Sequence, residues 1–467
     1  MMKNKLVVLL LVVGIVSLPL SNLLGLSGEN EPINGVEGSS ANFIKVTKIL
    51  QNKCVDCHSP GMTRMPIYAD FPIAKQLMAK DIENASARLI LTKELYSGAE
   101  KFSPVQLARI EGVVLNNSMP PALYLSMHWN DRLEAEEQRT ILAWIKDERS
   151  QLTWSQSASQ ALKGEPIQPL PLTVALDGKK VVLGKKLFHD TLLSGDGTLS
   201  CASCHSLLKG GTDQAKVATG INGQQGPINS PTVYNAMYNV AQFWDGRAKD
   251  LHAQAAGPVA NPGEMGANWE LVIEKLKQVP EYQTAFESLY AQQGLTMDTV
   301  TDAIAYFEES LVTPNSRFDQ YLRGNDSILT GNEKSGYELF KTTCASCHSG
   351  PALGGLSFEK MGVKQNYFML RGGSLTDSDQ GRFNVTKDEK DRHVFKVPVL
   401  RNIEMTAPYF HDGSASSLAE AVKVMAKVQR NKTLTADELD DLVAFLKTLT
   451  GEYKGKLLTQ LTQDDLK

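Results

Sequence analysis

All six cysteines of this 467-residue chain lie in three copies of one motif. Each copy has two cysteines separated by two residues and followed directly by a histidine: Cys54-Val-Asp-Cys57-His58, Cys201-Ala-Ser-Cys204-His205 and Cys344-Ala-Ser-Cys347-His348. Two thiols at this spacing add to the vinyl groups of one haem, and the histidine then binds its iron. Disulfides or zinc sites would not require a histidine after each pair. The motifs therefore predict three covalently bound c-type haems.

The residue on the far side of each iron decides what that haem can do. For the first haem the candidate ligands are Met119, in Asn116-Asn-Ser-Met119-Pro-Pro, and its rival His128. For the third haem the candidate is Met425, with His393 and His411 as rivals. A methionine ligand raises the potential of a c-type haem and suits it to carry electrons.

The second haem differs from the other two because its distal side lacks an obvious ligand. Between His205 and Trp244 there is no histidine, and Met237 is the only methionine. An iron without a distal ligand can bind a small oxidant. The second motif therefore predicts the reaction site, and the other two predict electron carriers.

Short helices are expected to hold the three motifs. Each motif follows an amphipathic stretch and precedes a helix with a central aromatic residue, Trp144, Tyr306 or Phe445. Three capping boxes mark helix starts, at Ser103 to Gln106, Thr330 to Glu333 and Thr435 to Glu438. The recurrence indicates duplication. The expected fold is all-α, with three cytochrome c-like haem domains in tandem and little β structure.

Composition divides the chain into four segments. We expect an N-terminal membrane anchor or signal at 1–28, a monohaem cytochrome c domain at 29–155, a second-haem domain at 156–322 and a third-haem domain at 323–467. The stretch from Gln151 to Pro171, rich in Ser, Gln and Pro, is typical of a linker.

The N-terminus indicates export from the cytoplasm. Lys3 and Lys5 precede an apolar run from Leu6 to Val16 that continues with interruptions to Leu26. An uncleaved inner-membrane anchor is favoured over a cleaved signal, because no convincing cleavage site follows. Either alternative places the body in the periplasm. The formal net charge of -4 and the absence of basic tracts give no indication of nucleic-acid binding.

From Val181 to Gly451 the chain resembles the bacterial dihaem cytochrome c peroxidases. The matching stretches include Gly226-Pro-Ile-Asn229-Ser-Pro-Thr, Ala241-Gln-Phe-Trp244-Asp-Gly-Arg247, Gly257-Pro-Val-Ala-Asn-Pro-Gly-Glu264-Met and Leu400-Arg-Asn-Ile-Glu-Met-Thr406-Ala-Pro408-Tyr-Phe-His411. With its extra N-terminal haem domain, the chain is similar to the membrane-anchored trihaem members that oxidise quinol.

The resemblance implies roles for individual residues. His205 would carry the peroxidatic haem, and His348 with Met425 the electron-transferring haem. Glu264 would be the acid/base, Gln254 and Phe243 would shape its pocket, and Trp244 would conduct electrons between the haems. Asn229, Thr406 and Pro408 match the calcium ligands of the family. Arg247 could hold a haem propionate or form a turn with Asp245.

One position departs from many dihaem members, which place a distal histidine on the resting peroxidatic iron. Ile221 stands at that position here, and isoleucine cannot bind iron. We therefore expect a five-coordinate or water-bound iron that needs no reductive activation.

The function expected from the sequence is reduction of hydrogen peroxide to water. The donor would be membrane quinol, or a small periplasmic cytochrome or copper protein. Two other functions remain open. A dihaem oxidase that modifies a protein substrate would have tyrosine where Met425 stands, and a pure multihaem electron carrier would have no vacant iron.

Overall fold

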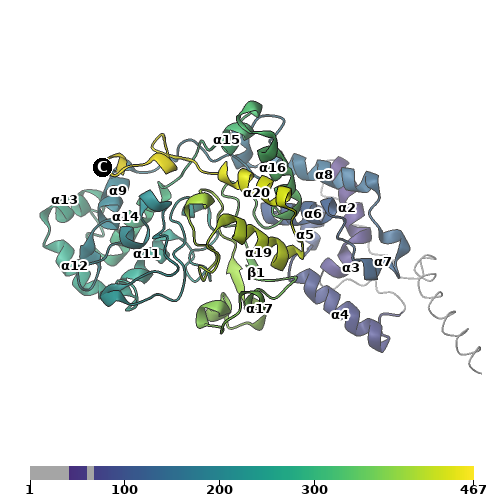
Figure 1. The fold of residues 1–467 in the computed structure, drawn as a ribbon, viewed down its shortest axis with the longest axis horizontal. Coiled ribbons are helices and arrows are strands. Elements are labelled where there is room, and N and C mark those ends of the chain that lie inside the picture. Colours follow the sequence, from purple (N-terminus) through teal and green to yellow (C-terminus); the bar gives the residue numbers. More distant parts are fainter. Residues whose placement is uncertain (1–40, 60–67, 467) are drawn as a thin grey trace, which may run out of the picture. The chain divides into compact units, whose positions relative to one another are not determined.

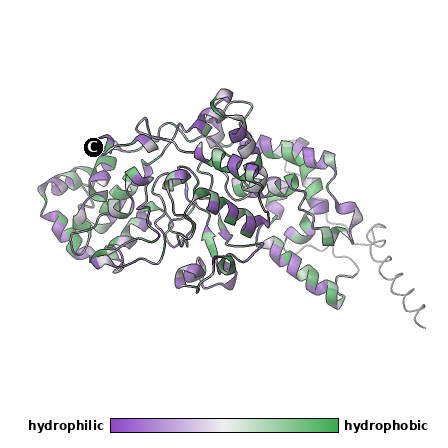
Figure 2. Ribbon diagram, in the orientation of Figure 1, coloured by the Kyte–Doolittle hydropathy of each residue, from purple (hydrophilic) through white to green (hydrophobic). Residues whose placement is uncertain are grey.

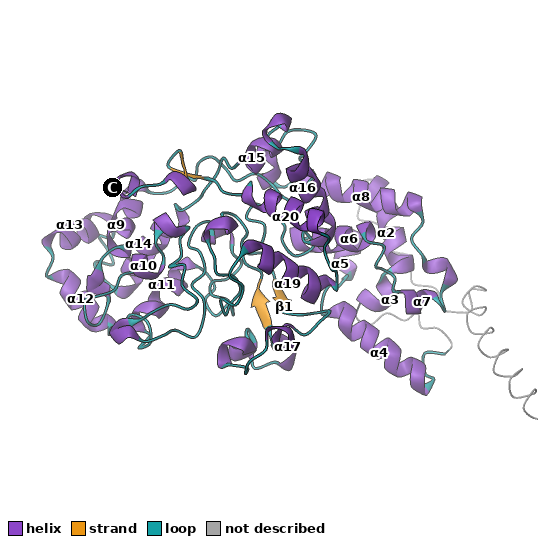
Figure 3. Ribbon diagram, in the orientation of Figure 1, coloured by secondary structure: helices purple, strands orange, loops and turns teal. Residues whose placement is uncertain are grey.

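The computed structural model describes residues 41–59 and 68–466, and the chain divides after Gln151 into two compact units (Figure 1). The segment expected to be an anchor or signal, residues 1–28, lies outside the described residues. Among the helices that are described, none has both the length and the apolar character needed to cross a bilayer. Helices and loops make up nearly all of the structure, as expected from the sequence (Figure 3).

The first unit packs helices around the first motif. Trp144 is fully buried and contacts the rings of Phe43 and Phe102. The capping box predicted at Ser103 and Gln106 is confirmed. The helices of this unit are α2 (Ala41–Lys53), α3 (Val55–His58), α4 (Pro72–Ser86), α5 (Lys93–Ser97), α6 (Pro104–Leu115), α7 (Ala122–Leu125) and α8 (Ala135–Ser150).

The second unit contains both remaining motifs. Its helices up to residue 309 are α9 (Gly178–Phe188), α10 (Cys201–Cys204), α11 (Leu251–Ala260), α12 (Trp269–Lys277), α13 (Pro280–Leu289) and α14 (Met297–Glu309). The later helices are α15 (Arg317–Leu322), α16 (Gly331–Thr343), α17 (Tyr367–Arg371), α18 (Phe383–Thr386), α19 (Leu418–Arg430) and α20 (Ala436–Lys447). Apolar residues form stripes along these helices, as helices packed on one side require (Figure 2).

The same helix crossing occurs twice in this unit. A Cβ added to Gly184 of α9 would lie 1.8 Å from the carbonyl oxygen of Ala303 in α14. A Cβ added to Gly336 of α16 would lie 2.0 Å from that of Asp441 in α20. Only glycine allows the two backbones to approach this closely. The repeated crossing supports the duplication inferred from the sequence, and the capping boxes at Thr330 and Thr435 are confirmed.

The β-strands of the described residues form two short two-stranded antiparallel sheets. Strand β1 (Phe358–Lys360) pairs with β2 (Val394–Lys396), with Phe358 opposite Lys396. Strand β3 (Glu452–Tyr453) pairs with β4 (Lys456–Leu457) near the C-terminus. The sheet of β1 and β2 lies in the segment of the third motif. Lys396 of strand β2 donates its backbone N–H to the carbonyl of Trp244, which belongs to the segment of the second motif.

Much of the stretch interpreted as a linker is a buried part of the third-haem domain. Ile167 and Leu170 are fully buried, and Ile167 belongs to the same core as Phe318 and Phe445. Leu170 N–H donates to the Asp319 carboxylate at 3.1 Å. The linker interpretation is therefore wrong for the residues around Ile167 and Leu170. Their apolar side chains are buried against residues that lie far away in the sequence.

The C-terminal tail makes the opposite connection. Tyr453, Leu458 and Leu466 pack into the core of the second-haem domain, together with Phe188 and Phe307. Ile167, near the start of the segment expected to form the second-haem domain, therefore packs in the core of the third, and the C-terminal tail packs in the core of the second. This exchange joins the two domains within one unit.

Candidate haem and peroxide sites

The three motif histidines have the same hydrogen-bond arrangement. The Nδ1 atom of His58 lies 2.8 Å from Leu89 O, that of His205 lies 3.3 Å from Gly211 O, and that of His348 lies 3.1 Å from Leu353 O. A backbone carbonyl at Nδ1 fixes the proton there and leaves Nε2 to bind a metal. Burial lowers the pKa of each imidazole and so favours the neutral form that ligates iron. All three histidines are therefore oriented as iron ligands.

The six cysteines are all described, and none forms a disulfide. Burial is the main reason that the pKa of Cys54, Cys201 and Cys344 is raised to about 12. These thiols are thus kept protonated and close to their motif histidines.

The two candidates for the distal ligand of the first haem have different surroundings. Met119 is half-buried and precedes Pro120 through a cis peptide bond. Both ring nitrogens of His128 lie within hydrogen-bond distance of oxygens, Nδ1 at 3.0 Å from Tyr124 O and Nε2 at 3.1 Å from Tyr68 Oη. Its ring also stacks on Tyr124, at a centroid distance of 3.8 Å. His128 would have to give up a contact to reach an iron, whereas no hydrogen bond holds the Met119 thioether.

A similar contrast separates the candidates for the third haem. Met425 is half-buried in α19 and packs against a cluster that includes Phe395 and Val428. His393 Nδ1 lies 2.7 Å from Asp379 O, and His411 Nε2 lies 2.8 Å from Asp379 Oδ1. Both histidines are therefore engaged with Asp379.

In the second-haem domain, the loop of Ile221 lies directly on the loop of Glu264. Ile221 N–H donates to Glu264 O at 2.8 Å. A Cβ added to Gly266 would lie 2.2 Å from Ile221 Cδ1, and one added to Gly220 would lie 2.0 Å from Gly263 O. The glycines allow this close contact between the loops. The structure therefore places an apolar side chain and a carboxylic acid together on these two loops.

Glu264 has the surroundings of a group that exchanges protons. Burial raises its pKa, while the positive charge of Arg247 and a hydrogen bond from Asn261 oppose that rise. Asn261 Nδ2 donates to Glu264 Oε1 at 2.8 Å. A carboxyl group with opposing influences of this kind is a functional-site candidate.

Phe243 contacts Arg247 and lies near helix α11, which carries Gln254. The guanidinium of Arg247 lies 3.5 Å from the centroid of the Phe243 ring. The ring edge comes within 3.5 Å of a Cβ added to Gly257, one turn after Gln254 on α11. Arg247 also forms the turn salt bridge with Asp245 that the sequence left as an alternative, at 3.1 Å.

Trp244 lies at the junction between the second- and third-haem domains. Its Nε1–H donates to Asn229 O at 2.9 Å, and its carbonyl accepts from Lys396 N–H at 2.8 Å. Its indole packs against the cluster that contains Met425, and its ring centroid lies 6.4 Å from that of His411. Trp244 is thus held on both sides by backbone contacts.

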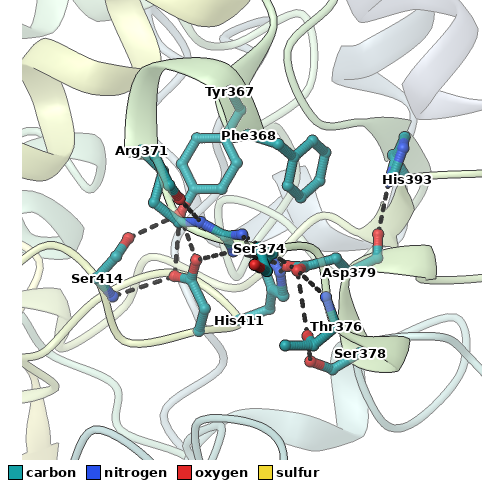
Figure 4. A network of polar contacts seen from close by, with 12 residues as sticks. Tyr367, Phe368, Arg371, Ser374, Thr376, Ser378, Asp379, His393, His411 and Ser414 are labelled. Carbon is teal, nitrogen blue, oxygen red and sulfur yellow. Dashed lines mark hydrogen bonds and ion pairs between the residues drawn. The ribbon is translucent and has the colours of Figure 1, made fainter.

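A buried network holds His411 in place (Figure 4). Arg371 donates to Asp379 at 2.8 Å and to Asp412 at 2.8 Å, and Tyr367 Oη donates to Asp412 at 2.9 Å. Burial opposes ionisation of Asp379, but the bonds from Arg371 and His411 keep its pKa well below the usual range. Asp379, His411 and Asp412 approach one another as metal ligands would. The Arg371 guanidinium, however, already forms ion pairs with both carboxylates.

The expected calcium ligands lie where two loops of the second unit meet. Asn229 N–H donates to His411 O at 2.8 Å, and Asn229 Nδ2 donates to Ala215 O at 2.9 Å. Thr406 Oγ1 donates to Ile403 O at 3.2 Å, and Pro408 follows a cis peptide bond. Among the described residues, no hydrogen bond ends on Asn229 Oδ1, Thr406 O or Pro408 O. These oxygens are of the type that calcium binds.

Comparison with known proteins agrees with this geometry. The family model described as di-haem cytochrome c peroxidase matches residues 178–327, a haem-binding domain matches 26–147 and a cytochrome c domain matches 333–450. The cytochrome c peroxidase Ccp of Escherichia coli (strain K12) is 44% identical over 414 residues, which cover 88% of each chain. The chain belongs to the di-haem cytochrome c peroxidase family. The cytochrome c551 peroxidase of Nitrosomonas europaea is 48% identical over 297 residues, covering 63% of this chain and 87% of the relative.

A solved structure is also similar to this di-haem peroxidase. It is the crystal structure of a MauG-like protein associated with microbial copper homeostasis, with a TM-score of 0.53 and 30% identity. The match covers 62% of this chain and 94% of that one. The family relationship therefore holds for sequence and fold alike.

Sequence reasoning missed several buried ionisable groups of this di-haem peroxidase. Arg371 and Asp379 belong to the network around His411, and Lys396 is buried beside Trp244. Glu308 of α14 is buried near Cys201, and burial raises its pKa to about 8. The signal for these residues was weak, since a charged residue inside an apolar stretch, such as Val394-Phe-Lys396-Val, only hints at burial.

Proposed function

We propose that this chain reduces hydrogen peroxide to two waters at a haem carried by His205. Membership of the di-haem cytochrome c peroxidase family makes it a haem-dependent peroxidase. The observation that carries the proposal is the contact between the loops of Ile221 and Glu264. This contact supports the proposal because Glu264 could exchange protons and Ile221 cannot ligate iron.

The chemistry divides between the cofactor and the protein. A haem bound through Cys201, Cys204 and His205 would supply the redox chemistry of the reaction. Glu264 takes the proton from one peroxide oxygen and gives it to the other, which departs as water. Two electrons and two further protons complete the balance to two waters. Phe243 and Gln254 line the pocket, and Arg247 and Asn261 favour the ionised form of Glu264 in which it can accept a proton.

We propose the same cofactor at the other two motifs, which gives three covalently bound haems in the three tandem domains expected from the sequence. Met425 completes the third haem and Met119 the first, and Trp244 connects the third haem to the second. The engagement of His128, His393 and His411 in other hydrogen bonds supports this assignment. A calcium ion bound by Asn229 Oδ1 and the carbonyls of Thr406 and Pro408 would hold the junction of the second and third domains.

The Met119 assignment makes a direct prediction. Replacing Met119 with Leu should remove the distal ligand of the first haem, so that the full-length protein gains a second iron that binds carbon monoxide. His128→Leu should leave the first haem six-coordinate, because its imidazole is held by Tyr124 and Tyr68. Carbon monoxide titration of the two reduced variants measures how many irons in each bind carbon monoxide. The assignment is wrong if His128→Leu opens the iron and Met119→Leu does not.

The physiological donor is proposed to be quinol, with the protein anchored to the inner membrane from the periplasmic side by the N-terminal segment. The apolar side chains of Phe71, Ile73 and Leu77, at and near the start of α4, are exposed, which suits a hydrophobic donor at the first unit. A small periplasmic cytochrome or copper protein is the alternative. Nothing in the charge distribution favours nucleic acid.

The donor is tested by peroxide turnover of the membrane-bound protein with a quinol as sole reductant. A version that begins after Leu26 is the matched control. Fast turnover by the full-length protein and slow turnover by the shortened one supports an anchored quinol peroxidase. Failure of both with quinol, together with equal rates with a soluble reduced cytochrome, would overturn the quinol assignment and leave the peroxidase assignment standing.

A further inference from the structure

Lys396 is a buried, positively charged residue among the apolar residues of strand β2. It ends β2, between Phe395 and Val397, and only 6% of the residue is exposed. Burial lowers the pKa of its ammonium group to about 8. Within residues 41–59 and 68–466, burial is the only influence found on that pKa, and no neighbouring carboxylate offsets it.

The other deeply buried cations of the chain have carboxylate partners. Arg401 lies 2.7 Å from Asp319, and Arg149 lies 2.7 Å from Glu111. A buried charge is costly unless an opposite charge or hydrogen bonds compensate it. The described protein atoms supply that compensation for Arg401 and Arg149 but not for Lys396. A partner for Lys396 is therefore expected from outside the polypeptide.

The surroundings of Lys396 show where that partner comes from. Its backbone N–H donates to Trp244 O at 2.8 Å. The next residue, Val397, accepts from Gly355 N–H at 2.8 Å, and a Cβ added to Gly354 would lie 2.1 Å from Pro398 O. The loop at Gly354 and Gly355 follows Leu353, whose carbonyl orients His348. Lys396 thus lies between Trp244 and the loop that positions the third proximal histidine.

A c-type haem is itself a source of carboxylates, because it carries two propionates on the edge away from its thioether bonds. We propose that the Lys396 ammonium pairs with a haem propionate at the junction of the second- and third-haem domains. The propionate could belong to the haem on His348 or to the haem on His205, because both haems carry the same carboxylates. The inference rests on haem attachment at these motifs and is independent of peroxide reduction.

The pairing has a consequence for electron transfer. A positive charge beside a haem stabilises the reduced iron, which carries one positive charge fewer than the oxidised iron. Removing that charge makes the haem harder to reduce. Lys396 would then be a positioning residue that holds a propionate next to Trp244 and favours arrival of the electron there.

The test measures the ratio of reduced to oxidised haem in the full-length protein at fixed ambient potentials, with no peroxide present. Lys396→Met removes the charge but keeps a long apolar side chain, and Lys396→Arg keeps the charge. Lys360→Met, on the exposed end of the paired strand β1, is the matched control. In Lys396→Met this ratio should fall about tenfold for one haem, and by no more than about twofold in the other two variants.

The spectrum of the shifted haem identifies the propionate. A shift of the methionine-ligated haem assigns it to His348, and a shift of the open haem assigns it to His205. Loss of haem from Lys396→Met but not from Lys396→Arg would also support the pairing. Unchanged ratios for all haems in Lys396→Met would overturn the proposal, as would equal losses of haem in the Met and Arg variants. Because no turnover is measured, neither result depends on the peroxidase assignment.

Discussion

Replacing Glu264 with Gln should lower peroxide turnover by about 100-fold or more, while all three haems stay attached. The amide keeps the size of the side chain and can still face Asn261, but it cannot take a proton from peroxide. General acid–base groups of this kind contribute about 10² to 10⁴ to a rate. Steady-state turnover with an artificial electron donor measures the loss.

The matched control is Glu270→Gln, which changes an exposed carboxylate on the neighbouring helix α12. It should keep wild-type turnover. Cyanide binding to the oxidised iron should be similar in wild type and Glu264→Gln, since the iron remains vacant. Near-normal turnover of Glu264→Gln would remove Glu264 from the mechanism.

The pH dependence gives a second readout of the same group. Glu264 must be ionised to accept a proton, and burial raises its pKa above the usual carboxyl value. Activity should therefore fall as pH decreases through that raised pKa, beginning at a higher pH than for an exposed glutamate. In Glu264→Gln the remaining activity should lack this acid limb. A profile of kcat/KM against pH for the two proteins tests this expectation.

Features set by spacing along the chain could be predicted from the sequence. The three capping boxes need only neighbouring residues, and all three form as expected. The motif histidines are followed within a few tens of residues by the carbonyls that orient them, so each haem site is largely local. Ile221 and Glu264 were identified from motifs, and the structure brings their loops together.

Features made by distant segments could not be predicted. Ile167 lies in a stretch with the composition of a linker, yet it fills a core formed by residues about 150 or more positions further along. Arg371, Asp379 and His411 form one network although they lie in separate segments of the chain. The burial of Lys396 could not be predicted either, because the sequence does not show which charged side chains lack a partner of opposite charge. Burial and charge pairing over such separations depend on the completed fold.

Introducing a histidine at Ile221 should convert the second haem to a state that must be reduced before it works. Dihaem relatives with a distal histidine at this position hold the resting iron six-coordinate. The Ile221 loop lies against the Glu264 loop, so an imidazole at residue 221 would lie on the same pair of loops as Glu264. If the ligated form outweighs the open form by about 99 to 1, apparent cyanide affinity falls about 100-fold.

Ile221→Leu is the control, because it changes the shape of the side chain without adding a ligand. The oxidised wild-type and Leu proteins should bind cyanide and turn over peroxide without delay. The His protein should do so only after its third haem has been reduced. An oxidised His protein as reactive as wild type would show that residue 221 does not face the iron, and a wild type that needs prior reduction would show that another side chain closes it. A delay in the His protein alone would mean that an apolar residue at 221 keeps the iron open.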